Sequence, residues 1–102
     1  MNLPSRYSLD TELIASAISR WAEIESPSYD AVAVNRMMDA ASSFMATMGA
    51  RIERISGSDN FGDVVTARFG SISTQGILVL GHLDTVHLVG TLQDTLPIRV
   101  EG

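Results

Sequence analysis

The stretch Ile77-Leu-Val-Leu-Gly-His-Leu-Asp84 decides the fold that we expect for this chain. Residues 77–80 are apolar without alternation, which is typical of a strand covered on both faces in the middle of a sheet. Two ionisable side chains, His82 and Asp84, follow at once. Open α/β sheets bind ligands at the carboxyl ends of their strands. The sequence therefore predicts a central strand over 77–80 with a candidate site directly after it.

A first amphipathic helix is predicted over residues 11–24. Asp10 can accept a hydrogen bond from the free amides of its first turn. Apolar residues recur at helical spacing and predict one buried stripe, formed by Ile14, Ala17, Ile18, Trp21 and Ile24. Pro27 follows soon after, and a proline disfavours helical backbone in the residue before it.

A second helix is expected to follow Pro27, with Ser28 or Asp30 as its cap and Gly49 as its left-handed C-terminal residue. Methionines on its core face are expected to fill the interior, rather than to bind a soft metal or a peptide, because they stand at helical spacing. The predicted core face comprises Val34, Met37, Met38, Ala41, Met45 and Met48, with Phe44 beside it.

The hydrophobic period changes after Gly49. Residues 51–55 predict a weak strand, and residues 64–69 alternate, with Val65, Ala67 and Phe69 on one face. The loop between them is rich in turn formers and predicts an antiparallel pair. A turn is expected over Ser71–Gln75, and a short β-like run over Ile98–Val100. The predicted fold is α/β, a layered domain with a mixed sheet, in which two helices precede three to four strands.

Length and composition indicate one small globular domain. The chain has 102 residues, of which 45% are hydrophobic and 19% charged, and this composition argues against disorder and low complexity. Size scaling predicts about 5,600 Å² of accessible surface for a folded chain of this mass, against about 16,000 Å² unfolded. A modest core is therefore expected.

The charge pattern excludes some partners. The net charge is −5, and all seven basic residues are arginines scattered along the chain, so no basic stripe favours nucleic acid or an anionic membrane surface. Without cysteine, a metal could be held only by histidine and carboxylate. The N-terminus has no apolar signal region, and the longest aliphatic run is too short to cross a bilayer. We expect a cytoplasmic protein.

His82 and Asp84 form the candidate site. Residues two apart on an extended chain share a face, so the two side chains are expected to lie together with Leu83 on the other face. One imidazole nitrogen can bind a metal while a carboxylate accepts the N–H of the other. A structural alternative stays open, in which Asp84 caps the turn through Thr85 and Val86 and His82 is a hydrogen-bonded, partly buried residue.

Three stretches carry a resemblance to a known superfamily: residues 77–87, Gly90-Thr91 and Leu96-Pro-Ile-Arg-Val-Glu-Gly102. They resemble the start of the zinc-dependent metallopeptidases that include glutamate carboxypeptidase, aminoacylase and succinyl-diaminopimelate desuccinylase. The run Glu25-Ser-Pro-Ser28 and residues 63–70 resemble the same superfamily's N-terminal region. The resemblance covers about residues 11–102, is most specific at 81–86 and is closest to the glutamate carboxypeptidase branch.

The resemblance implies that residues 1–102 are the N-terminal portion of a zinc-peptidase catalytic domain, without its lid, or dimerisation, domain. It implies a site with two zinc ions, in which His82 is a metal ligand and Asp84 is a catalytic carboxylate that orients it. A water activated by the metal and a glutamate base would cleave an amide next to a free carboxylate, in a small peptide or an N-acyl amino acid. The full-length protein is expected to form a homodimer.

The remaining zinc ligands and the glutamate base of that superfamily would lie beyond Gly102. The chain then holds at most one zinc ligand, and alone it is expected to be inactive, because a catalytic zinc ordinarily takes three protein ligands. His87 matches no ligand position and is expected in a loop beside the cleft, where a contact with substrate stays open. The spacing of His82, His87, Asp94 and Glu101 does not predict an independent metal site.

A second class of function stays open beside the enzyme. The chain could be a non-catalytic α/β binding or scaffold module in which the metal site has lapsed. A domain that binds an anion at a helix N-terminus is disfavoured, because no glycine-rich loop joins a strand to a helix.

Overall fold

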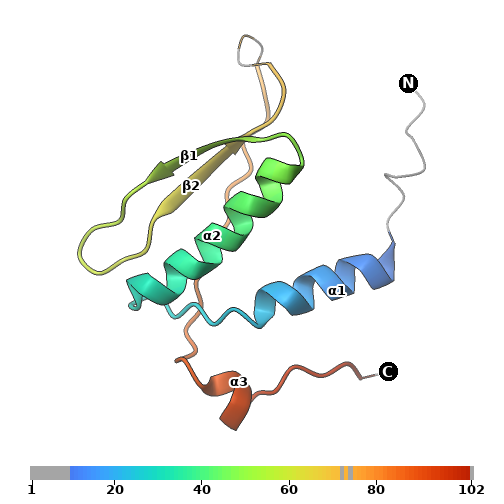
Figure 1. Cartoon of the computed structure of the whole chain (residues 1–102), viewed down its shortest axis with the longest axis vertical. Coiled ribbons are helices and arrows are strands. Elements are labelled where there is room, and N and C mark those ends of the chain that lie inside the picture. Colours follow the sequence, from blue (N-terminus) through green and yellow to red (C-terminus); the bar gives the residue numbers. More distant parts are fainter. Residues whose placement is uncertain (1–9, 72, 74, 102) are drawn as a thin grey trace.

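The computed structural model of the chain describes residues 10–71, 73 and 75–101, which form a small mixed α/β domain (Figure 1). The elements are, in chain order, α1 (Thr11–Ala22), α2 (Ala31–Thr47), β1 (Arg51–Ile55), β2 (Val64–Arg68) and the short helix α3 (Thr91–Asp94). The predicted two helices and antiparallel strand pair are confirmed. Within these residues no helix is both long and apolar enough to cross a membrane.

Both long helices begin at capping aspartates. The Asp10 carboxylate accepts from the Leu13 amide at 3.1 Å, and the Asp30 carboxylate accepts from the Ala33 amide at 3.0 Å. These bonds satisfy amides that the first turn of a helix leaves free. Of the two caps considered for α2, Asp30 is the one used. At the other end of α2, Gly49 has φ +94°, the left-handed backbone predicted for it.

The core lies between α2 and the β1–β2 hairpin, which pairs in register from Arg51–Arg68 to Ile55–Val64. Its buried side chains are Ala33, Val34, Met37 and Ala41. The loop between the strands comes so close to α2 that a Cβ on Gly62 would clash with the Val34 side chain. The predicted core face of α2 is therefore correct in its middle and wrong at its end, where Met48 is exposed.

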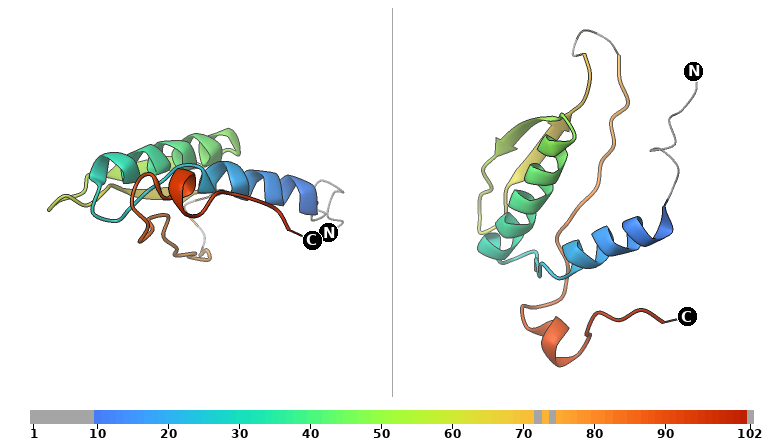
Figure 2. Two further views of the ribbon diagram at one scale, coloured as in Figure 1. Left: turned by 90° about the horizontal axis from the view of Figure 1, so that it is seen from below. Right: turned by 45° about the vertical axis from the view of Figure 1, so that its right-hand side comes forward.

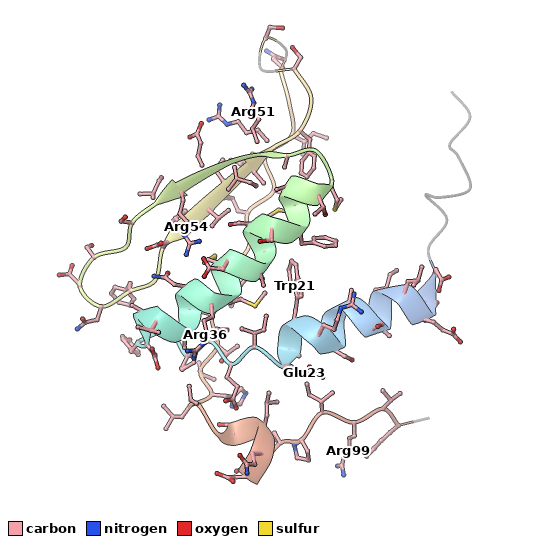
Figure 3. All side chains as sticks on the ribbon, viewed as in Figure 1. Trp21, Glu23, Arg36, Arg51, Arg54 and Arg99 are labelled. Atoms are coloured by element: carbon pink, nitrogen blue, oxygen red, sulfur yellow. The ribbon has the colours of Figure 1, made fainter. Side chains whose placement is uncertain are left out.

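Arg54 of β1 joins the hairpin to α2 by charge (Figure 3). Its guanidinium donates to the carboxylate of Asp39 on α2, and its Nε donates to Asp63 Oδ2 at 2.7 Å. The Asp63 carboxylate also accepts from the Gly57 amide at 3.0 Å. The Gly57 bond and the Arg54 bond together hold the pKa of Asp63 below its ordinary value. The ionised network thus fixes how the hairpin loop lies on the helix.

The predicted central strand is wrong. Residues 77–80 are not a strand, and Ile77, Leu78, Val79 and Leu80 are 95%, 79%, 85% and 83% exposed. Figure 2 shows this segment running as an extended chain with no strand beside it. A strand needs a neighbour to bond its backbone groups. β1 and β2 are such neighbours to each other, but among the described residues no strand pairs with 77–80.

Two further expectations need correction. Residues 98–100 are also not a strand, so the described sheet has two strands rather than three or four. The apolar stripe of α1 is not buried, since Ile14 and Ile18 are exposed. Trp21 of this stripe forms an edge-to-face pair with Phe44 of α2. In the turn expected over Ser71–Gln75, positions 72 and 74 lie outside the described residues, as does Gly102 in the C-terminal run of the resemblance.

The molecule is flat and open. Its accessible surface is 8530 Å², well above the roughly 5,600 Å² expected for a compact chain of this mass. The radius of gyration is 16.0 Å, against about 13 Å expected for a closed domain of this length. The shortest dimension is 19 Å. The left view of Figure 2 shows the molecule along its thin edge. Much apolar surface that the sequence predicts to be buried is therefore exposed.

Candidate functional site

The segment that carries His82 and Asp84 is held in place by the turn between α1 and α2. Pro27 and Thr85 form a parallel β-bridge, in which the Thr85 amide donates to the Ser26 carbonyl at 2.8 Å and the Ser28 amide donates to the Thr85 carbonyl at 3.0 Å. The Ser26 hydroxyl, which is buried, donates to the Leu83 carbonyl at 2.7 Å. We call this pairing of residues 26–28 with 83–85 the clasp.

His82 and Asp84 lie together at the clasp. His82 Nδ1 is 3.1 Å from Asp84 Oδ1 and 3.1 Å from the Asp84 carbonyl oxygen. Because a carboxylate and a carbonyl only accept, Nδ1 carries the proton, and in the neutral ring the lone pair is then on Nε2. The His82 side chain is 83% exposed and that of Asp84 37% exposed. The pairing follows the predicted two-residue spacing. The Nδ1 side of the imidazole is oriented by Asp84, and the Nε2 side is open.

Asp84 has a second partner that the sequence did not reveal. The Ser28 hydroxyl donates to Asp84 Oδ2 at 2.6 Å, so each carboxylate oxygen is bonded. The bond from Ser28, aided by the one from His82, holds the pKa of Asp84 below its ordinary value. Asp84 therefore stays an ionised acceptor. Asp84 does not cap the following turn, in which Thr85 Oγ1 accepts from the His87 amide at 3.3 Å.

Glu25 holds the chain beyond the site. Its carboxylate accepts from the Gly90 amide at 2.8 Å and from the Leu92 amide at 2.9 Å, at the beginning of α3. These two bonds lower the pKa of Glu25. Gly90, with φ +99°, makes the turn into α3. Neither α3 nor this contact was predicted, because the sequence signal of a four-residue helix is too short to be distinguished from a loop.

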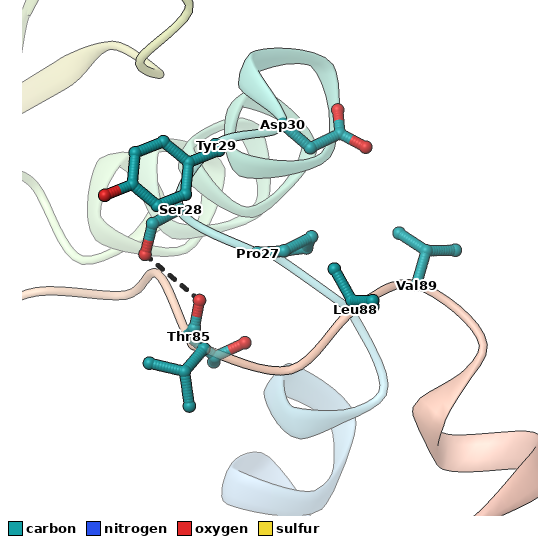
Figure 4. Close-up of a pocket in the computed structure, with 8 residues that line it drawn as sticks. Pro27, Ser28, Tyr29, Asp30, Thr85, Leu88 and Val89 are labelled. Atoms are coloured by element: carbon teal, nitrogen blue, oxygen red, sulfur yellow. Dashed lines mark hydrogen bonds between the residues drawn. The ribbon is translucent and has the colours of Figure 1, made fainter.

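Two cavities border the clasp. One of about 420 Å³ is lined by residues 27–30 and by Thr85, Val86, Leu88 and Val89 (Figure 4). The other, of about 400 Å³, lies between α1 and α3, and its lining includes Trp21, Leu83 and Leu92. His87 also lines this second cavity, in a loop as expected. His82 lines neither cavity, so the two histidines of the chain lie on different surfaces.

The site does not fit a complete zinc centre. In the part of the chain that the structure describes, no three histidine or carboxylate side chains are grouped so that they could hold a metal ion. A catalytic zinc ordinarily takes three protein ligands. What the arrangement provides is one imidazole of fixed orientation with an accessible Nε2. No family model matches the chain, and comparison with curated proteins and with solved structures finds no match either.

Proposed function

We propose that this chain is the N-terminal part of the catalytic domain of a zinc-dependent metallohydrolase similar to glutamate carboxypeptidase. The protein would cleave an amide next to a free carboxylate, in a small peptide or an N-acyl amino acid. The observation that supports this proposal best is the contact of 3.1 Å between His82 Nδ1 and Asp84 Oδ1, which leaves Nε2 accessible. Histidines that bind metals commonly donate their other N–H to a carboxylate in this way.

Each residue of the pair has its own role in the proposal. His82 would be one zinc ligand through Nε2, and Asp84 would hold the ring and raise the basicity of the imidazole. Zinc, when bound, lowers the pKa of a coordinated water and polarises the scissile carbonyl. The other ligands and the general base would come from residues outside these 102, so the chain alone would be inactive.

The exposed apolar surface supports an incomplete domain. A run such as 77–80 is typical of a strand with neighbours on both sides, yet its side chains are exposed and the accessible surface is 8530 Å². In the proposed full-length protein, further strands would flank this run and complete the mixed sheet. A lid domain would make the contacts of a homodimer, and we propose that the protein acts in the cytoplasm.

The two histidines allow a matched test of this proposal in the full-length protein. We expect His82→Ala to lose bound zinc and amide hydrolysis, and His87→Ala to keep its zinc, because only His82 is oriented by a carboxylate. Zinc per protein is measured by elemental analysis. Hydrolysis is measured on N-acyl amino acids and dipeptides, each with a free and with an amidated C-terminus. Unchanged zinc in His82→Ala would overturn the proposal. A wild-type protein without zinc or hydrolysis would favour a scaffold module with a lapsed site.

A further inference from the structure

Asp84 can orient His82 only if its own carboxylate is held. The terminal torsion of an aspartate side chain is broad, so the hydrogen bonds to its two oxygens largely determine how the carboxylate is turned. Here Oδ1 faces His82 Nδ1 at 3.1 Å, while Oδ2 accepts from the Ser28 hydroxyl at 2.6 Å. The bond from Ser28 is the shorter of the two, and the side chain that makes it is less exposed than the imidazole.

Ser28 is well placed to hold this carboxylate. Pro27 fixes its own φ, and the Ser28 amide bonds to the Thr85 carbonyl, one residue from Asp84. The hydroxyl is therefore brought to the carboxylate by the backbone of the clasp, with little further ordering. It also lies 3.0 Å from the Thr85 carbonyl (Figure 4), but one hydroxyl has one proton, and the charged acceptor at 2.6 Å makes the stronger bond.

We infer that Ser28 is a positioning residue that acts on His82 through Asp84. By holding Oδ2, the Ser28 hydroxyl keeps Oδ1 directed at His82 Nδ1, and thereby favours the tautomer in which Nδ1 is protonated and Nε2 is open. The consequence for a metal ligand rests on the proposed function. The orientation itself is a property of the chain without metal or substrate.

The test measures the tautomer of His82 by ¹⁵N NMR of the ring nitrogens, in the full chain without metal and at one fixed neutral pH. We expect Ser28→Ala to lower the ratio of the Nδ1–H to the Nε2–H form by roughly two- to tenfold, the range that corresponds to one hydrogen bond of typical net strength. Ser28→Thr keeps the hydroxyl and is expected to keep the ratio. Ser26→Ala is the matched control, because it removes a hydroxyl of the clasp that bonds to the Leu83 carbonyl and not to Asp84.

Each outcome decides the inference. An unchanged ratio in Ser28→Ala overturns it, and so does an equal change in Ser26→Ala, which would assign the effect to the clasp as a whole. If Ser28→Ala does not fold, Ser28→Val is compared with Ser28→Thr, because these two side chains have nearly the same shape and differ in the hydroxyl. An equal tautomer ratio in the two variants then overturns the inference. The proposed function is tested separately, by the zinc content of the His82→Ala variant. The zinc content can contradict the proposed function while the tautomer of His82 still responds to Ser28, and the tautomer can fail to respond while the zinc content supports the function.

Discussion

Two apolar regions of this chain differ in burial. In the unit formed by α2 and the β1–β2 hairpin, Val34, Met37 and Ala41 are buried. In the region after Gly76, residues 77–80 form the longest aliphatic run of the chain, yet all four side chains are exposed. Hydropathy shows that a segment would gain from burial, but burial needs a surface to pack against. The hairpin has α2 close by, and the aliphatic run has no such partner among the described residues.

The two regions are also held by different forces. The first depends on buried apolar area, which contributes about 25 cal/mol per Å². The second is held to the rest of the molecule mainly by polar contacts, namely the clasp and the two amide bonds of Glu25. A single such bond contributes only about 0.5–1.5 kcal/mol net. The candidate site lies on this second region.

Hydrogen exchange gives the largest expected difference between the two regions. The amides that pair β1 with β2 open only when the hairpin does, whereas residues 77–80 have no strand partner in the described structure. We expect exchange at 77–80 to be roughly a thousandfold faster, or more, than in the protected positions of the hairpin. Amide-resolved exchange of the isolated chain measures this. Equal protection of both regions would show that 77–80 is paired in solution.

Truncation of one apolar side chain in each region sharpens the comparison. Met37→Ala removes a side chain that is 2% exposed and is expected to lower the free energy of unfolding by about 2–5 kcal/mol. Leu80→Ala, at a residue 83% exposed, is expected to change it by less than about 0.5 kcal/mol. Urea unfolding followed by circular dichroism compares the two. A large effect of Leu80→Ala would mean that the run packs against something.

Acid is expected to have the smallest effect, and a local one. The folded pKa of Glu25 lies below its ordinary value of 4.5, because the Gly90 and Leu92 amides bond the carboxylate. A group with a lowered folded pKa stabilises the fold above its unfolded pKa and loses this contribution as the pH falls through the folded pKa. The contact with α3 is therefore expected to persist at neutral pH and to weaken below 4.5.

NMR of the Gly90 and Leu92 amides against pH measures this loss. Their shifts are expected to titrate with a midpoint below 4.5, and Glu25→Gln, which keeps an acceptor but has no charge to lose, should abolish the titration. A midpoint at or above 4.5 would contradict the hydrogen bonds that we assign to Glu25.

The candidate site was predictable only in part. His82 and Asp84 are two residues apart, and the alternation of an extended chain is enough to bring them together. Ser28 bonds to Asp84 from 56 residues away, and Glu25 bonds to Gly90 from 65 residues away. No periodicity relates positions so distant. In the sequence, Ser28 was equally suited to cap α2, and only the path of the chain gives that role to Asp30.

The sequence by itself determined where α1 starts, where α2 ends and that the two strands pair antiparallel. Caps, turns and hairpins act through groups a few residues apart, so their outcome is present in the local order of residues. Only the tertiary structure decided that 77–80 is exposed and that Ser28 meets Asp84. The exposure of 77–80 and the bond from Ser28 to Asp84 depend on which surfaces the folded chain brings together. Burial and long-range hydrogen bonds require a partner, and the local order of residues does not specify that partner.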